Sequence, residues 1–199
     1  MRILLLGPAP EKLIPCINSN GDQILTYNEK LNEQFIFTNQ IELIISYNYR
    51  FLISTEVLSS EGLLALNLHT SLLPYNRGAH PVLWSVLERT PLGVSIHQVD
   101  AGLDTGPIIL QKQLTLASNE KSLRQVYEEV NEELVKLFCI NWQNIRAGNF
   151  QFQPQVGPGT RHRSAQAKEF LATLENSWDT SIKEAQSCYA KFLDKRREK

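Results

Sequence analysis

The sequence has few of the features that mark disulfide-rich, zinc-binding or strongly basic proteins. It contains three cysteines among 199 residues, and its formal net charge is −1. Because Cys16, Cys139 and Cys188 are widely spaced, they suggest neither a disulfide framework nor a zinc site, and we expect buried or incidental thiols. The balanced charge gives no electrostatic reason to expect nucleic acid as a partner.

Long hydrophobic runs are also absent. No stretch approaches the roughly twenty apolar residues of a membrane-spanning helix. The apolar run at residues 3–6 is interrupted by Gly7 and Pro8, which makes it too short for a signal sequence. These absences predict a cytoplasmic protein with no membrane partner. A hydrophobic content of 42% and a charged content of 21% are ordinary for a globular chain long enough for one buried core.

Several cofactor and catalytic motifs are missing as well. The sequence has no G-x-G-x-x-G after its first apolar run, no Walker loop and no G-x-S-x-G elbow. The sequence therefore gives no sign of a dinucleotide site, a nucleoside triphosphate site or a serine hydrolase, and we expect no NAD. The four histidines show no H-E-x-x-H spacing and no pairing with cysteine, so we expect no metal.

The first part of the chain alternates short apolar runs with stretches of helix length. The runs predict strands at residues 2–6, 23–27, 41–47 and 64–69. The stretches between them predict short helices at residues 11–18, 30–38 and 55–62. This alternation favours right-handed βαβ units, and therefore an α/β fold with a mostly parallel sheet and flanking helices. Ligands of such sheets bind outside the carboxyl ends of the strands.

The later part of the chain predicts further elements of the same fold. A helix, two neighbouring strands and a long helix are expected at residues 81–89, 94–99, 108–116 and 123–148. Ser122 and Gln125 match a capping box before the long helix. Beyond Phe150 an irregular stretch precedes apolar residues at helical spacing, which predict a C-terminal helical tail.

Polar side chains gather where a predicted strand ends and in a later glycine-rich turn. Asn67 and His69 lie two residues apart at a strand end, so their side chains point to the same side of the sheet. An amide donor suits a developing oxyanion, and an imidazole can exchange a proton near neutral pH. Asp104 lies between Gly102 and Gly106, where its carboxylate could act on an imidazole or cap its own turn. The residues alone leave both the functional and the structural interpretation open.

Two separated blocks of sequence resemble the formyltransferases that use 10-formyltetrahydrofolate. They are Asn67-Leu68-His69-Thr70-Ser71-Leu72-Leu73-Pro74 with Arg77-Gly78, and Asp100-Ala101-Gly102-Leu103-Asp104-Thr105-Gly106-Pro107. The resemblance implies a Rossmann-like formyltransferase fold, with a catalytic domain at residues 1–150 and a loop plus helical extension of the same domain at 151–199. It also implies a catalytic trio of Asn67, His69 and Asp104.

The same resemblance implies the reaction and the cosubstrate site. The substrate amine attacks the formyl carbon directly, Asn67 and protonated His69 stabilise the tetrahedral oxyanion, and Asp104 holds His69 charged and helps to relay the amine proton. The folate pocket, formed largely by backbone groups, comprises Tyr49, Arg50, Phe51, Leu52, Asp100, Ala101, Gly102 and Asp104. Without the resemblance, Tyr49 and Phe51 are ordinary strand-end aromatics, and Asp100 favours a structural role in its turn.

Departures from related families narrow the expected substrate. Glycinamide ribonucleotide transformylases carry a phosphate-binding loop after the first strand, where this chain has Pro8 and Pro10, which lack amide donors. Methionyl-tRNA formyltransferases have an additional barrel domain and a basic surface. We expect neither feature in this sequence, and therefore no nucleic acid substrate. After Pro74 of the first block the chain reads Asn76-Arg77-Gly78-Ala79 and then Trp84-Ser85. In these residues it resembles the formyltransferases that act on a primary amine of a nucleotide-linked amino sugar.

The substrate residues implied by this resemblance are Ser71, Arg77, Gly78, His80 and His97. Arg77 could pair with a phosphate or form a structural salt bridge, and both histidines could be structural. Two alternatives for the function stay open: formylation of another small amine such as glycinamide ribonucleotide, or a catalytically silent folate- or nucleotide-binding domain. An apolar face on the helical tail is compatible with a homodimer.

Overall fold

The computed structural model describes residues 1–17, 21–116 and 118–197. Its contacts divide the chain into two compact units that interleave along the sequence. Unit 1 comprises Met1–His69, Ser95–Gln111 and Leu134–Gln155. Unit 2 comprises Thr70–Val94, Lys112–Glu133 and Val156–Lys199. The domain division at residue 150 stays a prediction.

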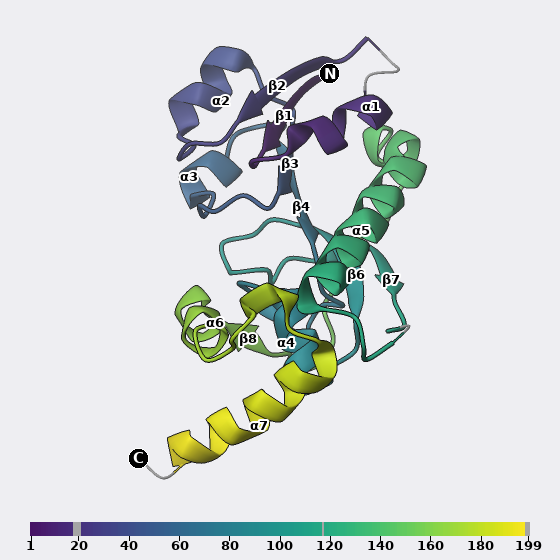
Figure 1. Ribbon diagram of the computed structural model, residues 1–199. Coiled ribbons are helices and arrows are strands. Elements are labelled where there is room, and N and C mark those ends of the chain that lie inside the picture. Colours follow the sequence, from purple (N-terminus) through teal and green to yellow (C-terminus); the bar gives the residue numbers. More distant parts are fainter. Residues whose placement is uncertain (18–20, 117, 198–199) are drawn as a thin grey trace. The chain divides into compact units, whose positions relative to one another are not determined.

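Within the described ranges, six strands form a sheet in the order β2-β1-β3-β4-β6-β7 (Figure 1). They are β1 (Arg2–Leu6), β2 (Gln23–Tyr27), β3 (Leu43–Tyr47), β4 (Leu64–His69), β6 (Gly93–Gln98) and β7 (Ile108–Gln113). β2, β1, β3 and β4 pair in parallel, and β6 pairs antiparallel to β4. The expected α/β fold with a mostly parallel sheet is confirmed.

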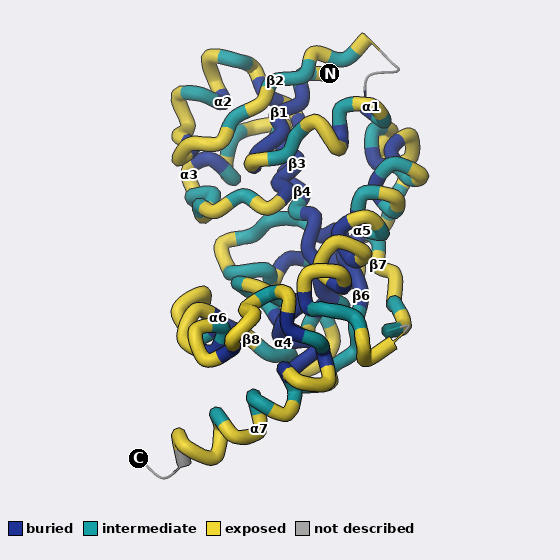
Figure 2. The backbone as a smooth tube through the Cα atoms, viewed as in Figure 1, coloured by how far each residue is buried: buried dark blue, intermediate teal, exposed yellow. Residues whose placement is uncertain are grey.

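The interior of unit 1 is built on the apolar runs of β1 and β3. Residues of both strands are buried along almost their whole length, as the dark blue segments of Figure 2 show. Burial on both faces explains why these strands are continuous apolar runs rather than alternating ones. Their side chains join Ile36 of α2 (Glu33–Asn39) and Val57 of α3 (Thr55–Leu58) in one buried cluster.

The short helices of unit 1 depend on local caps and prolines. The Asn32 side chain accepts a hydrogen bond from the backbone N–H of Phe35 and so begins α2. The helix expected at residues 11–18 is instead a 3₁₀ turn, η1 (Pro10–Lys12), followed by α1 (Ile14–Ile17). Pro10 and Pro15 lack backbone donors, which limits a continuous helix there. Asn18, the expected last residue, lies outside the described ranges.

The carboxyl ends of β1, β3 and β4 meet at one edge of the sheet. Ser46 of β3 is in register with Leu6 on one side and Asn67 on the other. Gly7 follows β1 with a φ of 126°, and a Cβ atom there would lie 1.9 Å from the carbonyl oxygen of Tyr47. This close approach and positive φ require glycine. At such an edge a parallel sheet binds its ligands.

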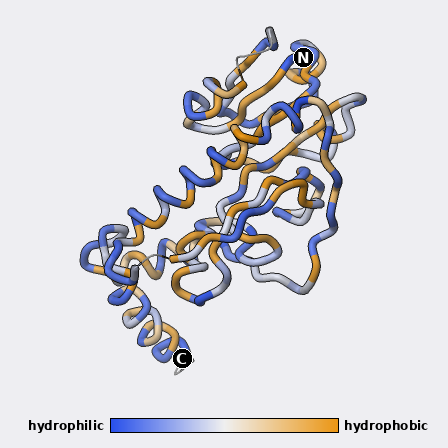
Figure 3. Tube along the Cα trace, turned by 90° about the vertical axis from the view of Figure 1, so that its right-hand side faces the viewer, coloured by the Kyte–Doolittle hydropathy of each residue, from blue (hydrophilic) through white to orange (hydrophobic). Residues whose placement is uncertain are grey.

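Helix α5 (Leu123–Arg146) confirms the long helix expected after the capping-box pattern. The N–H of Ser122 donates to the Gln125 side chain over 2.9 Å, and the N–H of Gln125 donates to the Ser122 hydroxyl over 3.2 Å. Both donors of a capping box are therefore satisfied. Figure 3 shows hydrophilic and hydrophobic residues alternating along the helical segments, which is typical of helices that bury one face.

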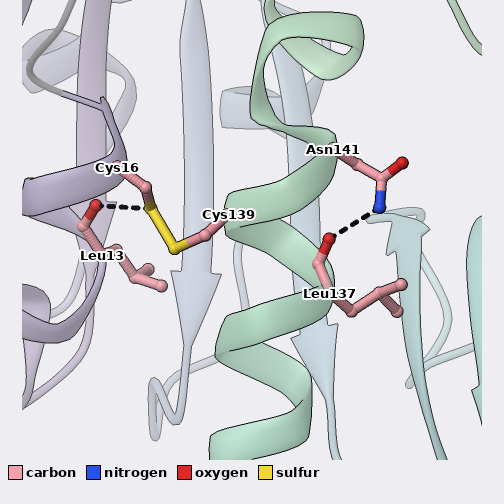
Figure 4. The surroundings of a disulfide bond; sticks show 5 residues. All are labelled: Leu13, Cys16, Leu137, Cys139 and Asn141. Carbon is pink, nitrogen blue, oxygen red and sulfur yellow. Dashed lines mark hydrogen bonds between the residues drawn. A yellow bond between two sulfur atoms is a disulfide. The ribbon is translucent and has the colours of Figure 1, made fainter.

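Two of the cysteines are paired, so the expectation of incidental thiols was wrong for them. Cys16 of α1 and Cys139 of α5 form a disulfide within unit 1, with their Cα atoms 5.3 Å apart (Figure 4). Cys188 is free. The two partners are separated by 123 positions in sequence. Sequence spacing cannot reveal this pair because it forms only when α5 packs beside α1.

Unit 2 contains a strand pair that the sequence did not predict. β5 (Arg77–Gly78) runs parallel to β8 (Arg161–His162). The helices of this unit include α4 (Pro81–Glu88), α6 (Ser164–Leu171), the 3₁₀ turn η2 (Ser177–Asp179) and α7 (Ile182–Arg197). The expected helical tail is thus present as α6 and α7. Within the described ranges, no helix combines the length and apolarity needed to cross a membrane.

Candidate active site

Strand β4 places Asn67 and His69 on one face at the carboxyl edge of the sheet. The antiparallel register pairs Asn67 directly with His97 of β6, so the His97 side chain lies on the same face. His69 and His97 have relative exposures of only 6% and 1%. Their rings meet edge to face, with centroids 6.2 Å apart. Two neighbouring strands therefore bring together an amide and two imidazoles.

Asp104 joins this group from the loop between β6 and β7. The side-chain amide of Asn67 donates to Oδ1 of Asp104 over 3.1 Å. Nδ1 of His69 lies 3.8 Å from Oδ2 of Asp104, and Nε2 of His97 lies 3.5 Å from Oδ1. The Asp104 side chain is 11% exposed, so little water screens these contacts. The structure thus brings the three predicted catalytic residues together, and adds His97 to them.

The hydrogen bonds of His97 indicate which ring nitrogen carries a proton. Nδ1 lies 2.7 Å from the carbonyl oxygen of Gln98, which can only accept, so Nδ1 is the donor. Nε2 lies 3.2 Å from the amide nitrogen of Asn67. In the neutral ring Nε2 accepts from Asn67, whereas in the protonated ring it donates to Asp104. Because the Asn67 amide has two hydrogens, neutral His97 and Asp104 together occupy both.

The Asp104 loop is held in an uncommon backbone conformation. Asp104 has a φ of 54°, in the left-handed region. A Cβ atom at Gly106 would lie 1.9 Å from a carbonyl oxygen at the end of β6, so this position requires glycine. The Asp100 carboxylate accepts hydrogen bonds from the Gly102 N–H over 3.1 Å and the Thr105 hydroxyl over 2.7 Å. Asp100 therefore stabilises the loop, in agreement with the structural role that the sequence favoured for it.

The predicted folate segment follows β3 at the same edge of the sheet. It consists of Tyr49, Arg50, Phe51 and Leu52. The Tyr49 hydroxyl accepts from the N–H of Leu31 over 3.0 Å and donates to the carbonyl of Glu29, and burial raises the pKa of this phenol. The Arg50 guanidinium lies 4.6 Å from the ring centroid of Phe51. Leu52 is 71% exposed. Folate binding by this segment stays a prediction.

Four residues predicted to bind the substrate lie in unit 2. They are Ser71, Arg77, Gly78 and His80. Ser71 is fully buried, and its hydroxyl donates to a backbone carbonyl over 2.6 Å. Arg77 and Gly78 form β5. His80 precedes α4, its ring centroid lies 5.9 Å from that of Trp178, and burial lowers its pKa. Their roles stay predictions.

One residue of this site was missed by the sequence analysis. The Gln155 side-chain amide donates to the carbonyl oxygens of Asp104 and Gly106, over 2.9 Å and 2.8 Å. Gln155 lies in the irregular stretch after α5, where neither periodicity nor spacing singles out one glutamine. Its partners are 51 and 49 positions away, so only the folded chain reveals the contact.

The site combines groups that can donate a hydrogen bond, exchange a proton and balance a positive charge. An amide beside an imidazole can stabilise an oxyanion, and a neighbouring carboxylate can orient the imidazole or accept a proton. Within the described ranges, no group of three or more His, Cys, Asp or Glu side chains could hold a metal ion. The chemistry that these side chains support directly is acyl transfer.

The family model described as formyl transferase matches residues 19–139 of the chain. The chain belongs to the formyl transferase family. The family expected from the two sequence blocks is therefore confirmed. Within this formyl transferase domain lie Asn67, His69, His97 and Asp104.

Solved formyltransferase structures resemble the protein over most of its length. The formyltransferase PseJ from Anoxybacillus kamchatkensis, in complex with UDP-4,6-dideoxy-4-formamido-L-AltNAc and tetrahydrofolate, is 38% identical with a TM-score of 0.86. The match covers 93% of this chain and 97% of that one. A 4-N formyltransferase from Francisella tularensis shares the fold, with a TM-score of 0.79 at 20% identity over 94% of this chain and 85% of that one.

Curated relatives of the formyl transferase family include longer enzymes. The methionyl-tRNA formyltransferase of Thermodesulfovibrio yellowstonii is 32% identical over 149 residues, or 74% of this chain and 44% of that protein. The dTDP-4-amino-4,6-dideoxyglucose formyltransferase of Mycobacterium tuberculosis is 33% identical over 90 residues, or 45% of this chain and 38% of that protein. The chain spans about half the length, or less, of the curated relatives that it matches.

Proposed function

We propose that this protein transfers a formyl group from 10-formyltetrahydrofolate to the 4-amine of a UDP-linked 4-amino-4,6-dideoxy sugar. The observation that carries the proposal is the 38% identity to the Anoxybacillus formyltransferase over almost the whole of both chains. That enzyme was solved with a UDP sugar bearing a 4-formamido group and with tetrahydrofolate. These two molecules are the products that such a transfer would leave.

The side chains at the sheet edge fit formyl transfer to an amine. The cosubstrate supplies an activated formyl group, whose carbonyl oxygen gains negative charge when an amine adds to its carbon. Asn67 and protonated His69 are the donors that stabilise this charge. Asp104, with Oδ2 3.8 Å from Nδ1 of His69, balances the imidazolium and assists removal of the amine proton. Collapse of the tetrahedral adduct then breaks the bond between the formyl carbon and N10 of the folate, and N10 takes up a proton as tetrahydrofolate leaves.

The contacts of Asn67 give His97 a part in this mechanism. Asp104 and neutral His97 occupy both hydrogens of the Asn67 amide. When His97 is protonated, Nε2 turns from acceptor to donor and pairs with Asp104 instead, which releases one Asn67 hydrogen for the oxyanion. His97 thus acts from within the catalytic group, while its predicted role in substrate binding remains compatible with this position.

The two segments predicted to bind folate both lie in unit 1, which supports a shared binding site. Tyr49, Ile53 and Val99 pack against the same buried cluster, and the N–H of Val99 donates to the carbonyl of Ala65 over 2.8 Å. The segment after β3 and the turn after β6 therefore begin from the same part of the core. Backbone groups in both segments suit the alternating donors and acceptors of a pterin edge.

The sugar nucleotide needs groups that recognise phosphate and sugar oxygens. Arg77 supplies a guanidinium, whose planar donors suit a diphosphate. Ser71, Gly78 and His80 are the other unit 2 residues that we assign to this substrate, on the sequence resemblance alone. His80 is neutral more readily than an ordinary histidine because burial lowers its pKa.

An acceptor panel tests the proposal. The protein is incubated with 10-formyltetrahydrofolate and, separately, a UDP-4-amino-4,6-dideoxy sugar, a dTDP-4-amino sugar, glycinamide ribonucleotide and methionyl-tRNA. Mass spectrometry follows the gain of one formyl group, and NMR locates it on the product. We expect product with the UDP sugar, on its 4-amine.

The other results of the panel contradict specific parts of the proposal. Formylation of glycinamide ribonucleotide or methionyl-tRNA in place of the UDP sugar would contradict the proposed acceptor but still support formyl transfer to an amine. Absence of product with every amine, together with folate binding by calorimetry, would support the silent binding domain. The Asp104→Asn variant, run in parallel, distinguishes enzymatic formylation from spontaneous transfer.

A further inference from the structure

Gln155 is brought to the Asp104 loop by a short strand-like contact. The N–H of Ile108 donates to the carbonyl of Gln153, and the N–H of Gln153 donates back to the carbonyl of Ile108, both over 2.8 Å. This reciprocal pair fixes the segment after α5 against the start of β7. Gln155 follows two residues later, so its side chain reaches the loop that precedes β7.

Both hydrogens of the Gln155 amide are used on that loop. Nε2 donates to the carbonyl oxygen of Asp104 over 2.9 Å and to that of Gly106 over 2.8 Å. A primary amide nitrogen has only these two hydrogens. The two acceptors flank Thr105, so one side chain sets the orientation of two peptide planes on either side of it.

The backbone that Gln155 holds has an intrinsic cost. Asp104 adopts a φ of 54°, in the left-handed region, which few non-glycine residues occupy and which aspartate tolerates better than most. The Asp100 carboxylate constrains the loop on both sides of Asp104, through Gly102 and Thr105, and the Gln155 amide constrains it at Asp104 and at Gly106. The carboxylate that results from this geometry faces Asn67, His69 and His97.

We propose that Gln155 is a positioning residue for Asp104 and that it acts on formyl transfer through the backbone of the Asp104 loop. Gln155 touches no reacting group in this account. Its removal leaves the groups assigned to the amine substrate in place but lets the carboxylate leave its position beside His69. The kinetic part of this inference rests on the proposed function.

The first test compares Gln155→Ala and Gln155→Glu with Gln153→Ala. Gln153 lies in the same segment, and its backbone bonds survive the substitution. We expect Gln155→Ala to lower kcat by on the order of tenfold or more with the KM for the amine substrate within about twofold, because loss of orientation slows the chemical step. Gln155→Glu is expected to be slower still, since it sets carboxylate oxygens against two carbonyl oxygens. Gln153→Ala should match wild type.

A double-mutant cycle distinguishes positioning from general support of the fold. If Gln155 acts through Asp104, Gln155→Ala causes little further loss in the Asp104→Asn background. A multiplicative loss in the double variant, or a wild-type kcat for both Gln155 variants, would overturn the inference. A Gln155→Ala variant that is too unstable to assay is replaced by Gln155→Met, which keeps the length of the side chain but has no hydrogen-bond donor.

A spectroscopic readout separates this inference from the acceptor assignment. The ring resonances of His69 and His97 are recorded by heteronuclear NMR in wild type, Gln155→Ala, Asp104→Asn and Gln153→Ala. Displacement of the Asp104 carboxylate moves both ring signals of Gln155→Ala toward those of Asp104→Asn, whether or not any amine is formylated. Unchanged ring signals in Gln155→Ala would contradict the positioning role even if the acceptor assignment is correct.

Discussion

The side-chain amide of Asn67 donates to the carboxylate of Asp104 over 3.1 Å, which joins a strand end to a loop 37 positions later in the sequence. The antiparallel register places His97 of β6 beside Asn67, and the loop after β6, which begins beside Ala65, turns back to bring Asp104 to Asn67. His69 and His97 complete the group from the same two strands. The catalytic chemistry therefore depends on sheet register as much as on residue type.

Replacement of Asn76 by alanine is expected to destabilise the protein. Asn76 is fully buried, its amide donates to the hydroxyls of Ser85 and Thr90, and its carbonyl accepts from the hydroxyl of Thr160. The substitution removes a partner of the buried Ser85 hydroxyl and of two partly buried threonine hydroxyls, and should cost about 3 kcal/mol of unfolding free energy in urea titrations. The control is Asn176→Ala, because Asn176 is exposed and its side chain makes no capping hydrogen bond to η2. Equal stability of the two variants would refute this role of Asn76.

Asp22 is expected to make the stability of unit 1 depend on acid pH. Its buried carboxylate pairs bidentately with Arg146 and lies 3.1 Å from the Met1 amine, and the Arg146 hydrogen bonds lower the pKa of Asp22. A lowered folded-state pKa gives stabilisation that is complete above the ordinary pKa of aspartate and is lost as pH falls through the folded value. Asp22→Asn should cost about 2 kcal/mol at neutral pH.

The pH profile of this variant provides the check. Melting curves of wild type and Asp22→Asn are predicted to begin to converge as the pH falls below about 4, the ordinary pKa of aspartate, and to meet only below the lowered folded-state pKa of Asp22. Glu61→Gln, at an exposed acidic position, should follow wild type at every pH. A difference between wild type and Asp22→Asn that persists undiminished into acid would contradict this assignment.

Reduction of the Cys16–Cys139 disulfide is expected to lower stability. The bond closes a loop of 123 positions, for which the chain-entropy model gives about 5 kcal/mol. Peptide mapping without reductant should recover the cross-linked peptide, and urea unfolding should shift when reductant is added. Cys139→Ser should match reduced wild type, whereas Cys188→Ser should retain the shift. Free thiols at both positions in protein purified without reductant would contradict the pairing.

Most of the sheet and half of the site could be predicted because they depend on short-range patterns. Continuous apolar runs identified β1 and β3, and the two-residue spacing of Asn67 and His69 placed both on one face. The capping box located α5 for the same reason, since its two partners are three positions apart. Asp104 was predicted from the glycine-rich turn that holds it and from the second sequence block of the family resemblance.

The features that sequence analysis missed all depend on distant segments packing together. The Cys16–Cys139 bond, the β5–β8 pair and the contacts of Gln155 each join residues far apart in the chain. No local periodicity encodes such contacts. His97 was predicted near the substrate, but its ring hydrogen bonds to Asn67 became apparent only from the register of β4 and β6.

The catalytic trio is tested most directly by single-turnover transfer of an isotopically labelled formyl group to the UDP-4-amino sugar. In wild type the label should pass to the 4-amine with one tetrahydrofolate released per product. His69→Ala and Asp104→Asn should fold normally and transfer the label on the order of a hundredfold more slowly or worse. Wild-type rates in either variant would remove that residue from the mechanism, and release of the label as formate would contradict direct transfer to the amine.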